Sequence, residues 1–402
     1  MHPYIRSIHN GLRYWQEKAG NLDDEAVAQL NAKRVSLYHI LKEGLRLEET
    51  QLATISLIVK LGHFIETCGY WEEWLPLLEQ AIAACADAPD PTAPALYARL
   101  LCWQGYLLYD GQQRHEEAVP VLQTARQMAQ RVDDQRLLAE TLFFLGEVHH
   151  QMHQYDAASR YAHEALTLFR QQSESSSWVA ATLNSLGNIA CDQGEWDTAV
   201  EYLNESVALW RQDPRTVRLA RVLFYLAIAY TGQEALEQAH ACLAEAYQLI
   251  VDSSHEIDKS RVLNQTGVIY YRQKAWAEAA AAFQRANTPY LQNSPDLFMQ
   301  AQLANNLGNV FYEQHHWSAA ETYLRQAISL WQVQKNELNL GNGLGSLGKV
   351  LAAQAKKGEA DECFTEATAL LAQFPQNQWA NKLLAEFRKC QRQLWQEKEE
   401  EE

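Results

Sequence analysis

The sequence predicts an all-α solenoid of about eight helix-turn-helix repeats, with capping helices at both ends. Two observations support this prediction: a small residue that closes an apolar pair returns about every 40 residues, and alanines follow it at constant spacing. A fixed period of this kind is typical of stacked repeats, which bury their apolar faces against one another. The recurring small residues, here called anchors, are Gly62, Gly105, Gly146, Gly187, Ala227, Gly267, Gly308 and Gly348.

Small residues behind the anchors indicate a second helix in every repeat. Neighbouring helices approach closely only where side chains are small. We therefore expect a helix A around each anchor and a helix B around the alanines that follow. Alanines stand 12 residues after an anchor at Ala158, Ala199, Ala239, Ala279, Ala320 and Ala360, and 19 after at Ala81, Ala165, Ala246, Ala286, Ala327 and Ala367. Aromatic residues stand nine after at Trp71, Tyr155, Trp196, Trp276 and Trp317. In repeat 2 the pattern is displaced by one residue, at His115 and Ala118.

A leucine-glycine pair in helix A, an aromatic at the turn and paired alanines in helix B resemble the tetratricopeptide repeat (TPR). The resemblance covers about residues 50–373. The period of about 40 exceeds the usual 34 of this family, as in the longer arrays of kinesin light chain and Pins-type scaffolds. The run from Gly69 to Ala81 also resembles the TPR sensor regions of bacterial STAND signalling proteins. The resemblance implies a right-handed superhelix whose helices A line a concave groove.

On this pattern the chain divides into four parts. We expect residues 1–48 to form an N-terminal helical cap or degenerate repeat, 49–373 eight TPR repeats, 374–396 a C-terminal capping helix and 397–402 an acidic tail. No segment between repeats is long enough to separate a catalytic domain from the array. Gly341, Gly343 and Gly345 should each weaken helix A of repeat 8 by about 1 kcal/mol. That helix is therefore expected to start late or to let a backbone come close.

Composition limits the partners and the compartment. With 34 basic and 50 acidic residues, the net charge of −16 disfavours nucleic acid as a partner. The seven cysteines are scattered and form no Cys-x-x-Cys pair, which is typical of a reducing compartment. No export signal and no apolar run of membrane-spanning length is present. We expect a soluble, cytoplasmic protein without membrane contact, and the sequence leaves its oligomeric state open.

Two resemblances to catalytic or metal sites are better explained by the repeats. The run from Gly343 to Gly348 matches G-x-G-x-x-G, but no strand precedes it and the repeat register accounts for it. His149, His150 and His153 lack the acidic partner of a metalloprotease helix. No nucleophile with a base, carboxylate pair or cofactor fingerprint is found. We expect no catalytic residues, no metal, no cofactor and no enzyme activity.

Asparagine recurs on helix A at positions that the TPR resemblance places in the groove. A carboxamide offers one acceptor and two donors, which suits hydrogen bonding to the main chain of an extended peptide. Because asparagine is a poor residue for a helix interior, its recurrence indicates peptide binding. The alternative is that asparagine is simply frequent beside the leucine-glycine pair. The candidate residues are Asn184, Asn264 and Asn305 three before an anchor, Asn188 and Asn309 one after, and Gln265 and Asn306 between.

Arginines and tyrosines of repeats 5 and 6 complete the predicted peptide-binding site. Guanidinium groups clamp carboxylates in a bidentate manner, so these repeats are the best candidate for an acidic anchor of a ligand. The alternative is that the arginines are solvated or pair with nearby glutamates. Acidic residues and His150 are expected to cluster in repeats 3 and 4. The peptide-binding candidates are Arg221, Tyr225, Arg261, Tyr271 and Arg272; the expected cluster is Glu140, Glu147, His150 and Asp192.

These features favour a non-catalytic scaffold that binds an extended peptide segment of a partner in the concave groove, within a regulatory or signalling assembly. One alternative is a STAND-like TPR sensor that changes pitch on trigger binding and controls a separately encoded effector. Another is a peptide-controlled TPR regulator acting through its N-terminal helices, although no residues match the effector bundle of such proteins. In each case the partner is a protein or peptide.

Overall fold

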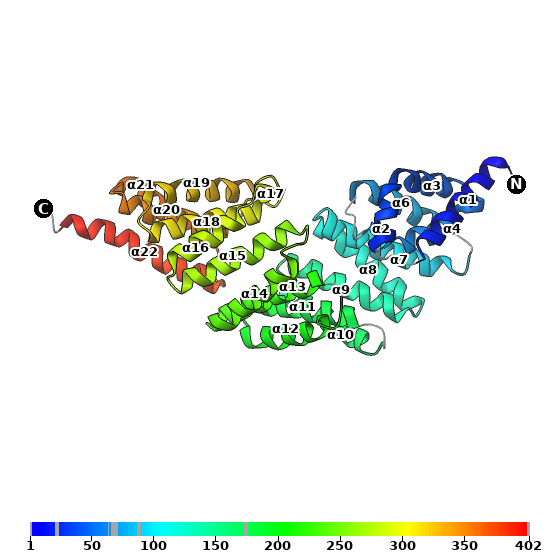
Figure 1. The fold of residues 1–402 in the computed structure, drawn as a ribbon, viewed down its shortest axis with the longest axis horizontal. Helices are drawn as coiled ribbons and strands as arrows, with labels where there is room; N and C mark the ends of the chain where they lie inside the picture. The colour runs from blue at the N-terminus through cyan, green and yellow to red at the C-terminus, as the bar shows by residue number, and fades with distance from the viewer. Residues whose placement is uncertain are drawn as a thin grey trace. The chain divides into compact units, whose positions relative to one another are not determined.

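The structure, a computed structural model, describes residues 2–20, 24–62, 64–65, 71–86, 90–172, 176–214 and 216–399. Within these ranges the regular structure is helical and no β-strand is found (Figure 1). The chain divides into two compact units, Met1–Leu209 (unit 1) and Trp210–Glu402 (unit 2). The predicted all-α fold is confirmed. Gly69 and Tyr70 of the STAND-like run, and residues 400–402 of the predicted tail, lie outside the described residues.

Unit 1 starts with three helices ahead of the first repeat and continues as helix pairs. Its helices are α1 (Pro3–Lys18), α2 (Asp24–Ala32), α3 (Arg34–Arg46), α4 (Glu48–Lys60), α6 (Trp71–Ala86), α7 (Ala93–Tyr106), the π-helix η1 (Leu107–Gly111), α8 (His115–Arg131), α9 (Gln135–Gln151), α10 (Tyr155–Arg170), α11 (Ser176–Gln193) and α12 (Trp196–Trp210).

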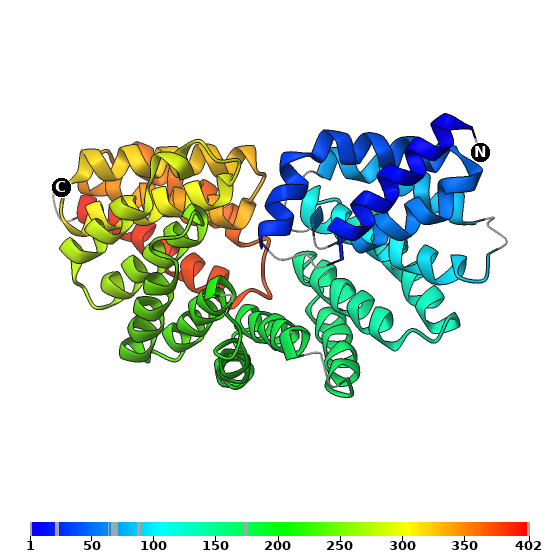
Figure 2. The same cartoon turned by 45° about the vertical axis from the view of Figure 1, so that its right-hand side comes forward.

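Unit 2 continues the pairs and ends in a long single helix. Its helices are α13 (Thr216–Gly232), α14 (Leu236–Ile250), α15 (Glu256–Arg272), α16 (Trp276–Ala286), the short α17 (Pro289–Gln292), α18 (Leu297–Glu313), α19 (Trp317–Val333), α20 (Glu337–Ala353), α21 (Lys357–Leu371) and α22 (Gln378–Glu399). Helices A and B of each pair pack against each other, and each helix B also packs against the next helix A in its unit (Figure 2).

The predicted register of the repeats is confirmed. In repeats 3 to 8, helix A begins 11 residues before its anchor. Helix A of repeat 8 follows this rule, since α20 begins at Glu337, so the expectation of a late start was wrong. Its extra glycines instead admit side chains from neighbouring helices: an added Cβ would stand 3.0 Å from Leu371 at Gly341, and 3.2 Å from Ile328 at Gly343.

The anchors are small because a large side chain of helix B lies directly over them. A Cβ added at Gly187 would stand 2.5 Å from Leu203, and one added at Gly267 would stand 2.5 Å from Phe283. In both repeats the covering residue stands 16 positions after the anchor. Gly146 is an exception, because Ala162 occupies that place and the added Cβ would be 3.6 Å from its Cβ.

Helix A ends in a turn that repeats as regularly as the anchors do. The residue seven positions after the anchor adopts a positive φ in repeats 3 to 8, at His153, Gly194, Glu234, Lys274, His315 and Ala355. The residue after it donates its N–H to a carbonyl of helix A, as Gln154 does to His149 at 2.9 Å. This is the usual way to satisfy carbonyl groups at a helix end. Only Gly194 is of the residue type that favours such a backbone conformation.

A π-helix explains the one-residue displacement in repeat 2. The η1 turn closes with the N–H of Gln112 donating to the carbonyl of Leu107 at 3.1 Å, five residues back. A π-turn accommodates one more residue than an α-turn. The residue of positive φ, Gln113, therefore stands eight positions after Gly105, and the covering Leu122 stands 17 after it.

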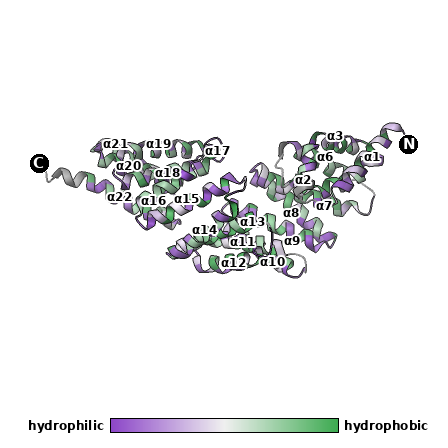
Figure 3. Cartoon of the chain, viewed as in Figure 1, coloured by the Kyte–Doolittle hydropathy of each residue, from purple (hydrophilic) through white to green (hydrophobic). Residues whose placement is uncertain are grey.

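Helices outside the eight pairs cover apolar surface of the first and last repeats. Helix α1 buries Ile8, Leu12 and Trp15 and contacts α3 and α4. Helix α22 packs on α20 and α21 and buries Phe387 and Leu394. Apolar and polar residues share nearly every helix (Figure 3), as expected of helices with one buried face. The division of the chain at residues 48, 373 and 396 stays a prediction.

Candidate functional site

The predicted peptide-binding residues lie on four helices A. Asn184 and Asn188 are on α11 of unit 1, and the others are on α13, α15 and α18 of unit 2. The contacts of each group are described within its own unit.

Asn264 is buried in a chain of carboxamides that joins α15 to α18. It is only 4% exposed. Its Oδ1 accepts a hydrogen bond from Asn306 Nδ2 at 2.9 Å, and its Nδ2 donates to Gln302 Oε1 at 3.4 Å. These bonds connect neighbouring repeats, so Asn264 acts first as a structural link, with Asn306 as the more accessible partner.

Three other asparagines have a buried acceptor without a hydrogen-bond partner among the described residues. The atoms are Oδ1 of Asn184, Asn188 and Asn305. Asn305 is 6% exposed, and its Oδ1 lies 3.9 Å from the Cβ position of Gly343, on the side of α20. An unsatisfied buried acceptor is costly, so a donor that reaches it would gain free energy. Asn309 is half-buried on α18.

Each candidate arginine of repeats 5 and 6 forms an ion pair with an aspartate of the following helix A. Arg221 donates from Nε and Nη2 to Asp258 Oδ2, at 3.1 and 3.0 Å. Arg261 Nη2 lies 3.3 Å from Asp296 Oδ2. The two arginine side chains remain 55% and 46% exposed. The carboxylates therefore orient the guanidinium groups without removing them from solvent.

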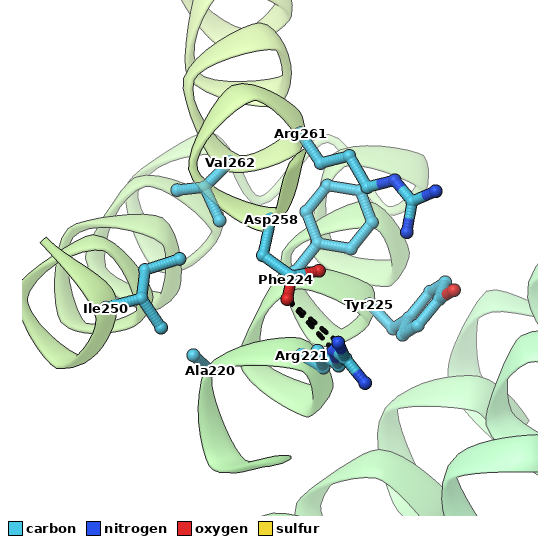
Figure 4. A pocket seen from close by; sticks show the side chains of 8 residues that line it. All are labelled: Ala220, Arg221, Phe224, Tyr225, Ile250, Asp258, Arg261 and Val262. Atoms are coloured by element: carbon cyan, nitrogen blue, oxygen red, sulfur yellow. Dashed lines mark hydrogen bonds and ion pairs between the residues drawn. The ribbon is translucent and has the colours of Figure 1, made fainter. Parts of the chain in front are cut away.

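Arg221, Tyr225 and Arg261 line one small pocket between α13, α15 and the end of α14 (Figure 4). Ala220, Ile250 and Val262 form its apolar side, and the arginines lie on the opposite side with Tyr225, as Figure 4 shows. The cavity volume is about 40 Å³. That space admits one small group, far less than the several hundred Å³ of a site for a drug-sized ligand.

The remaining candidates of α15 contact the ends of neighbouring helices. Arg272 Nη1 donates to the carbonyl of Thr231 at 2.9 Å, and Gln265 Nε2 lies 3.5 Å from Thr231 Oγ1. Tyr271 donates its hydroxyl to Glu313 at 3.4 Å. Burial and the charge of Glu313 raise the pKa of Tyr271, so it stays a neutral donor. The structure thus brings Arg221, Tyr225 and Arg261 into one pocket and leaves Tyr271 outside it.

The polar cluster expected in repeats 3 and 4 forms, but without Glu140. Glu147 accepts hydrogen bonds from Tyr109, at 3.2 Å, and from Ser185. His150 Nε2 lies 2.8 Å from Asp192 Oδ2.

Glu140 is instead bound by Arg99 and by Arg136, whose Nε lies 3.1 Å away. The sequence analysis missed Arg99, Tyr109 and Ser185. Their separations of 38 to 41 residues from their partners, close to one repeat period, are the signal that would have found them.

His150 should make stability depend on pH. Burial lowers its pKa, but the hydrogen bond to Asp192 and the charges of Glu147 and Asp192 outweigh burial and leave the pKa raised. A raised pKa stabilises the fold fully below the ordinary histidine value, and this contribution is lost as pH rises through the folded-state pKa. We expect the advantage of the wild type over His150→Gln in unfolding free energy to shrink between about pH 6 and pH 8.

Urea unfolding of both proteins across this pH range measures the effect. Asp192→Asn, which keeps the histidine and removes the charge of its partner, should weaken the same trend. A free-energy difference between wild type and His150→Gln that is constant with pH would contradict this assignment.

The described residues include no group of three histidine, cysteine or acidic side chains placed to hold a metal ion. His149 stacks on Tyr161 with ring centroids 5.3 Å apart, and His153 Nδ1 lies 3.0 Å from the Tyr155 hydroxyl. The three histidines thus belong to the polar end of α9. No helix in the described part of the chain combines the length and apolarity needed to cross a bilayer.

Comparisons with known proteins agree with this architecture. A tetratricopeptide repeat model matches residues 96–171 and 178–250, and a second tetratricopeptide repeat model matches residues 300–333. No curated protein sequence matches the chain.

Three solved structures are similar. The apo form of RapI is 16% identical, covers 92% of this chain and 99% of its own, and has a TM-score of 0.63. A Rap protein complexed with Competence and Sporulation Factor is 11% identical, covers 87% and 99%, and has a TM-score of 0.58. A putative kinesin light chain of Podosopora anserina is 16% identical, covers 51% and 100%, and has a TM-score of 0.40. At these identities the two Rap structures establish the fold.

Stacked helix pairs with small anchors define an α-solenoid of the kind that serves as a protein-interaction scaffold, generally without catalytic activity. The chain is a tetratricopeptide repeat protein.

Proposed function

We propose that this protein binds an extended segment of a partner protein or peptide through the helices A of unit 2. The observation that carries the proposal is the pocket of Arg221, Tyr225 and Arg261, where two half-exposed guanidinium groups face an apolar hollow. A protein of similar fold has been solved in complex with Competence and Sporulation Factor, which supports ligand binding by this architecture. A role in a regulatory or signalling assembly stays a prediction.

The geometry favours a ligand that places an apolar side chain beside a carboxylate. Ile250 and Val262 would contact the apolar group, while Arg221 and Arg261 would bind the carboxylate. Asp258 and Asp296 already hold the guanidinium groups in place, so less side-chain entropy is lost on binding. Asn306 and Asn309 on the neighbouring α18 would bind the peptide main chain.

Selection from a random peptide library against the purified protein, followed by affinity measurement, tests the proposal. We expect enriched sequences to contain an apolar residue next to an acidic residue or a free C-terminus. The double variant Arg221→Gln, Arg261→Gln should bind them at least about tenfold more weakly, since each charged hydrogen bond contributes on the order of 1.5 to 3 kcal/mol.

Arg285→Gln is the matched control, because Arg285 is an exposed arginine on helix B that contacts Tyr247 outside the pocket. It should leave affinity unchanged. Enriched peptides without an acidic group, or equal affinity for the double variant and the control, would show that the pocket is not the binding site. A ligand-induced change of the scattering profile would favour the sensor alternative.

A further inference from the structure

Helix α22 carries a basic face in a strongly acidic chain. Lys382, Arg388, Lys389 and Arg392 are all exposed. Their spacing along an α-helix places them together, on the side away from the buried Phe387. The chain as a whole has a net charge of −16, so a cluster of four cations stands out from the average surface.

The opposite side of α22 is the one that unit 2 occupies. Phe387 is 1% exposed and packs in the core of the last repeat. Glu386, at the edge, accepts from Lys349 Nζ at 3.1 Å, and Gln391 donates to Asp361 at 2.8 Å. None of the ion pairs between described residues uses the four cations of the basic face. Exposed Ala385 lies among them and leaves room for close approach.

Charge along this helix is segregated. Beyond Leu394 the sequence reverses sign, with glutamate at position 397 and at positions 399–402 against the single Lys398. Helix α22 extends to Glu399. Because the acidic residues continue the helix that carries the cations, they lead away from the basic face of their own copy. A second helix of the same sequence running antiparallel would place its acidic end over that face.

We propose that the basic face of α22 binds α22 of a second copy of this chain in an antiparallel pair. A two-fold axis makes the contact twice, with the glutamates of each copy against Arg388, Lys389 and Arg392 of the other. A parallel pair would oppose like charges. Exposed ion pairs are individually weak and are screened by salt, so the dimer should be reversible and salt-sensitive.

Sedimentation equilibrium of the full chain at low and high salt tests the proposal. We expect a monomer–dimer equilibrium whose association constant falls at least about tenfold from 0.05 to 0.5 M NaCl, where the screening length shortens several-fold. Lys389→Glu with Arg392→Glu should abolish the dimer. Glu399→Lys with Glu400→Lys and Glu401→Lys should abolish it as well.

Combining the two sets of reversals should restore dimerisation, because the charges are complementary again. Lys60→Glu with Lys335→Glu, two exposed lysines outside α22, is the control for net charge and should dimerise as the wild type does. A monomer at every concentration, or loss of the dimer in the combined variant, would overturn the proposal. A dimer that depends on the cations but not on the glutamates would also overturn it. None of these outcomes bears on the pocket of α13 and α15.

Discussion

Replacing Gly345 by alanine should release helix α22 from the last repeat and lower the unfolding free energy by about 3 kcal/mol. An added Cβ would stand 2.1, 2.3 and 2.3 Å from three ring atoms of Phe387. That ring is 1% exposed and packs in the core of the last repeat with Phe364, so it has no free space to move into. The gain in helix propensity from glycine to alanine, about 1 kcal/mol, is too small to offset the overlap.

Urea unfolding measures the loss, and limited proteolysis within residues 378–399 reports the release of α22. Gly358→Ala is the control, since Gly358 lies at the start of the adjacent α21 and nothing stands within 4 Å of its Cβ position. The control should be as stable as the wild type or slightly more so. If Gly345→Ala kept both its stability and its protease resistance, the close packing of Phe387 on α20 would be wrong.

Alanine at the anchor Gly267 should cost about 2 kcal/mol of unfolding free energy, whereas alanine at the anchor Gly146 should cost nothing. At Gly267 the new Cβ would meet ring atoms of Phe283 at 2.5, 2.6 and 2.9 Å. At Gly146 the nearest atoms are 3.4 Å away, which is ordinary contact, because Ala162 takes the place of the large residue.

The two anchors are therefore a matched pair in one chain. Both variants add the same methyl group at the same position of helix A, so helix propensity favours them equally, by up to about 1 kcal/mol. Chemical unfolding under identical conditions separates the packing term. Equal shifts for Gly146→Ala and Gly267→Ala would show that the residue 16 positions after the anchor does not determine the need for glycine.

Much of the fold follows from residue spacing alone. The anchors and alanines predicted eight helix pairs, and the structure contains eight, from α4 with α6 to α20 with α21. The spacing also revealed the displacement at His115. It did not reveal its cause, because one extra residue fits a longer turn as well as a π-helix. The structure puts it in η1, before the turn.

The candidate site was predicted less completely. Register placed Arg221, Tyr225 and Arg261 on neighbouring helices, and they do line one pocket. The sequence analysis considered glutamates as partners of these arginines, but the partners are Asp258 and Asp296. An ion pair between helices depends on their axial offset, which residue spacing does not report.

The sequence by itself determined the helix pairs, their period and the positions where side chains must be small, because these depend on local spacing and on side-chain volume. The tertiary structure decided which side chain covers each anchor and which candidate binding residues already have partners within the protein. The physical reason is distance along the chain: Phe283 covers an anchor 16 residues before it, and Asn306 bonds to Asn264 from 42 residues away. Such contacts exist only once neighbouring helices have packed at a defined offset and angle.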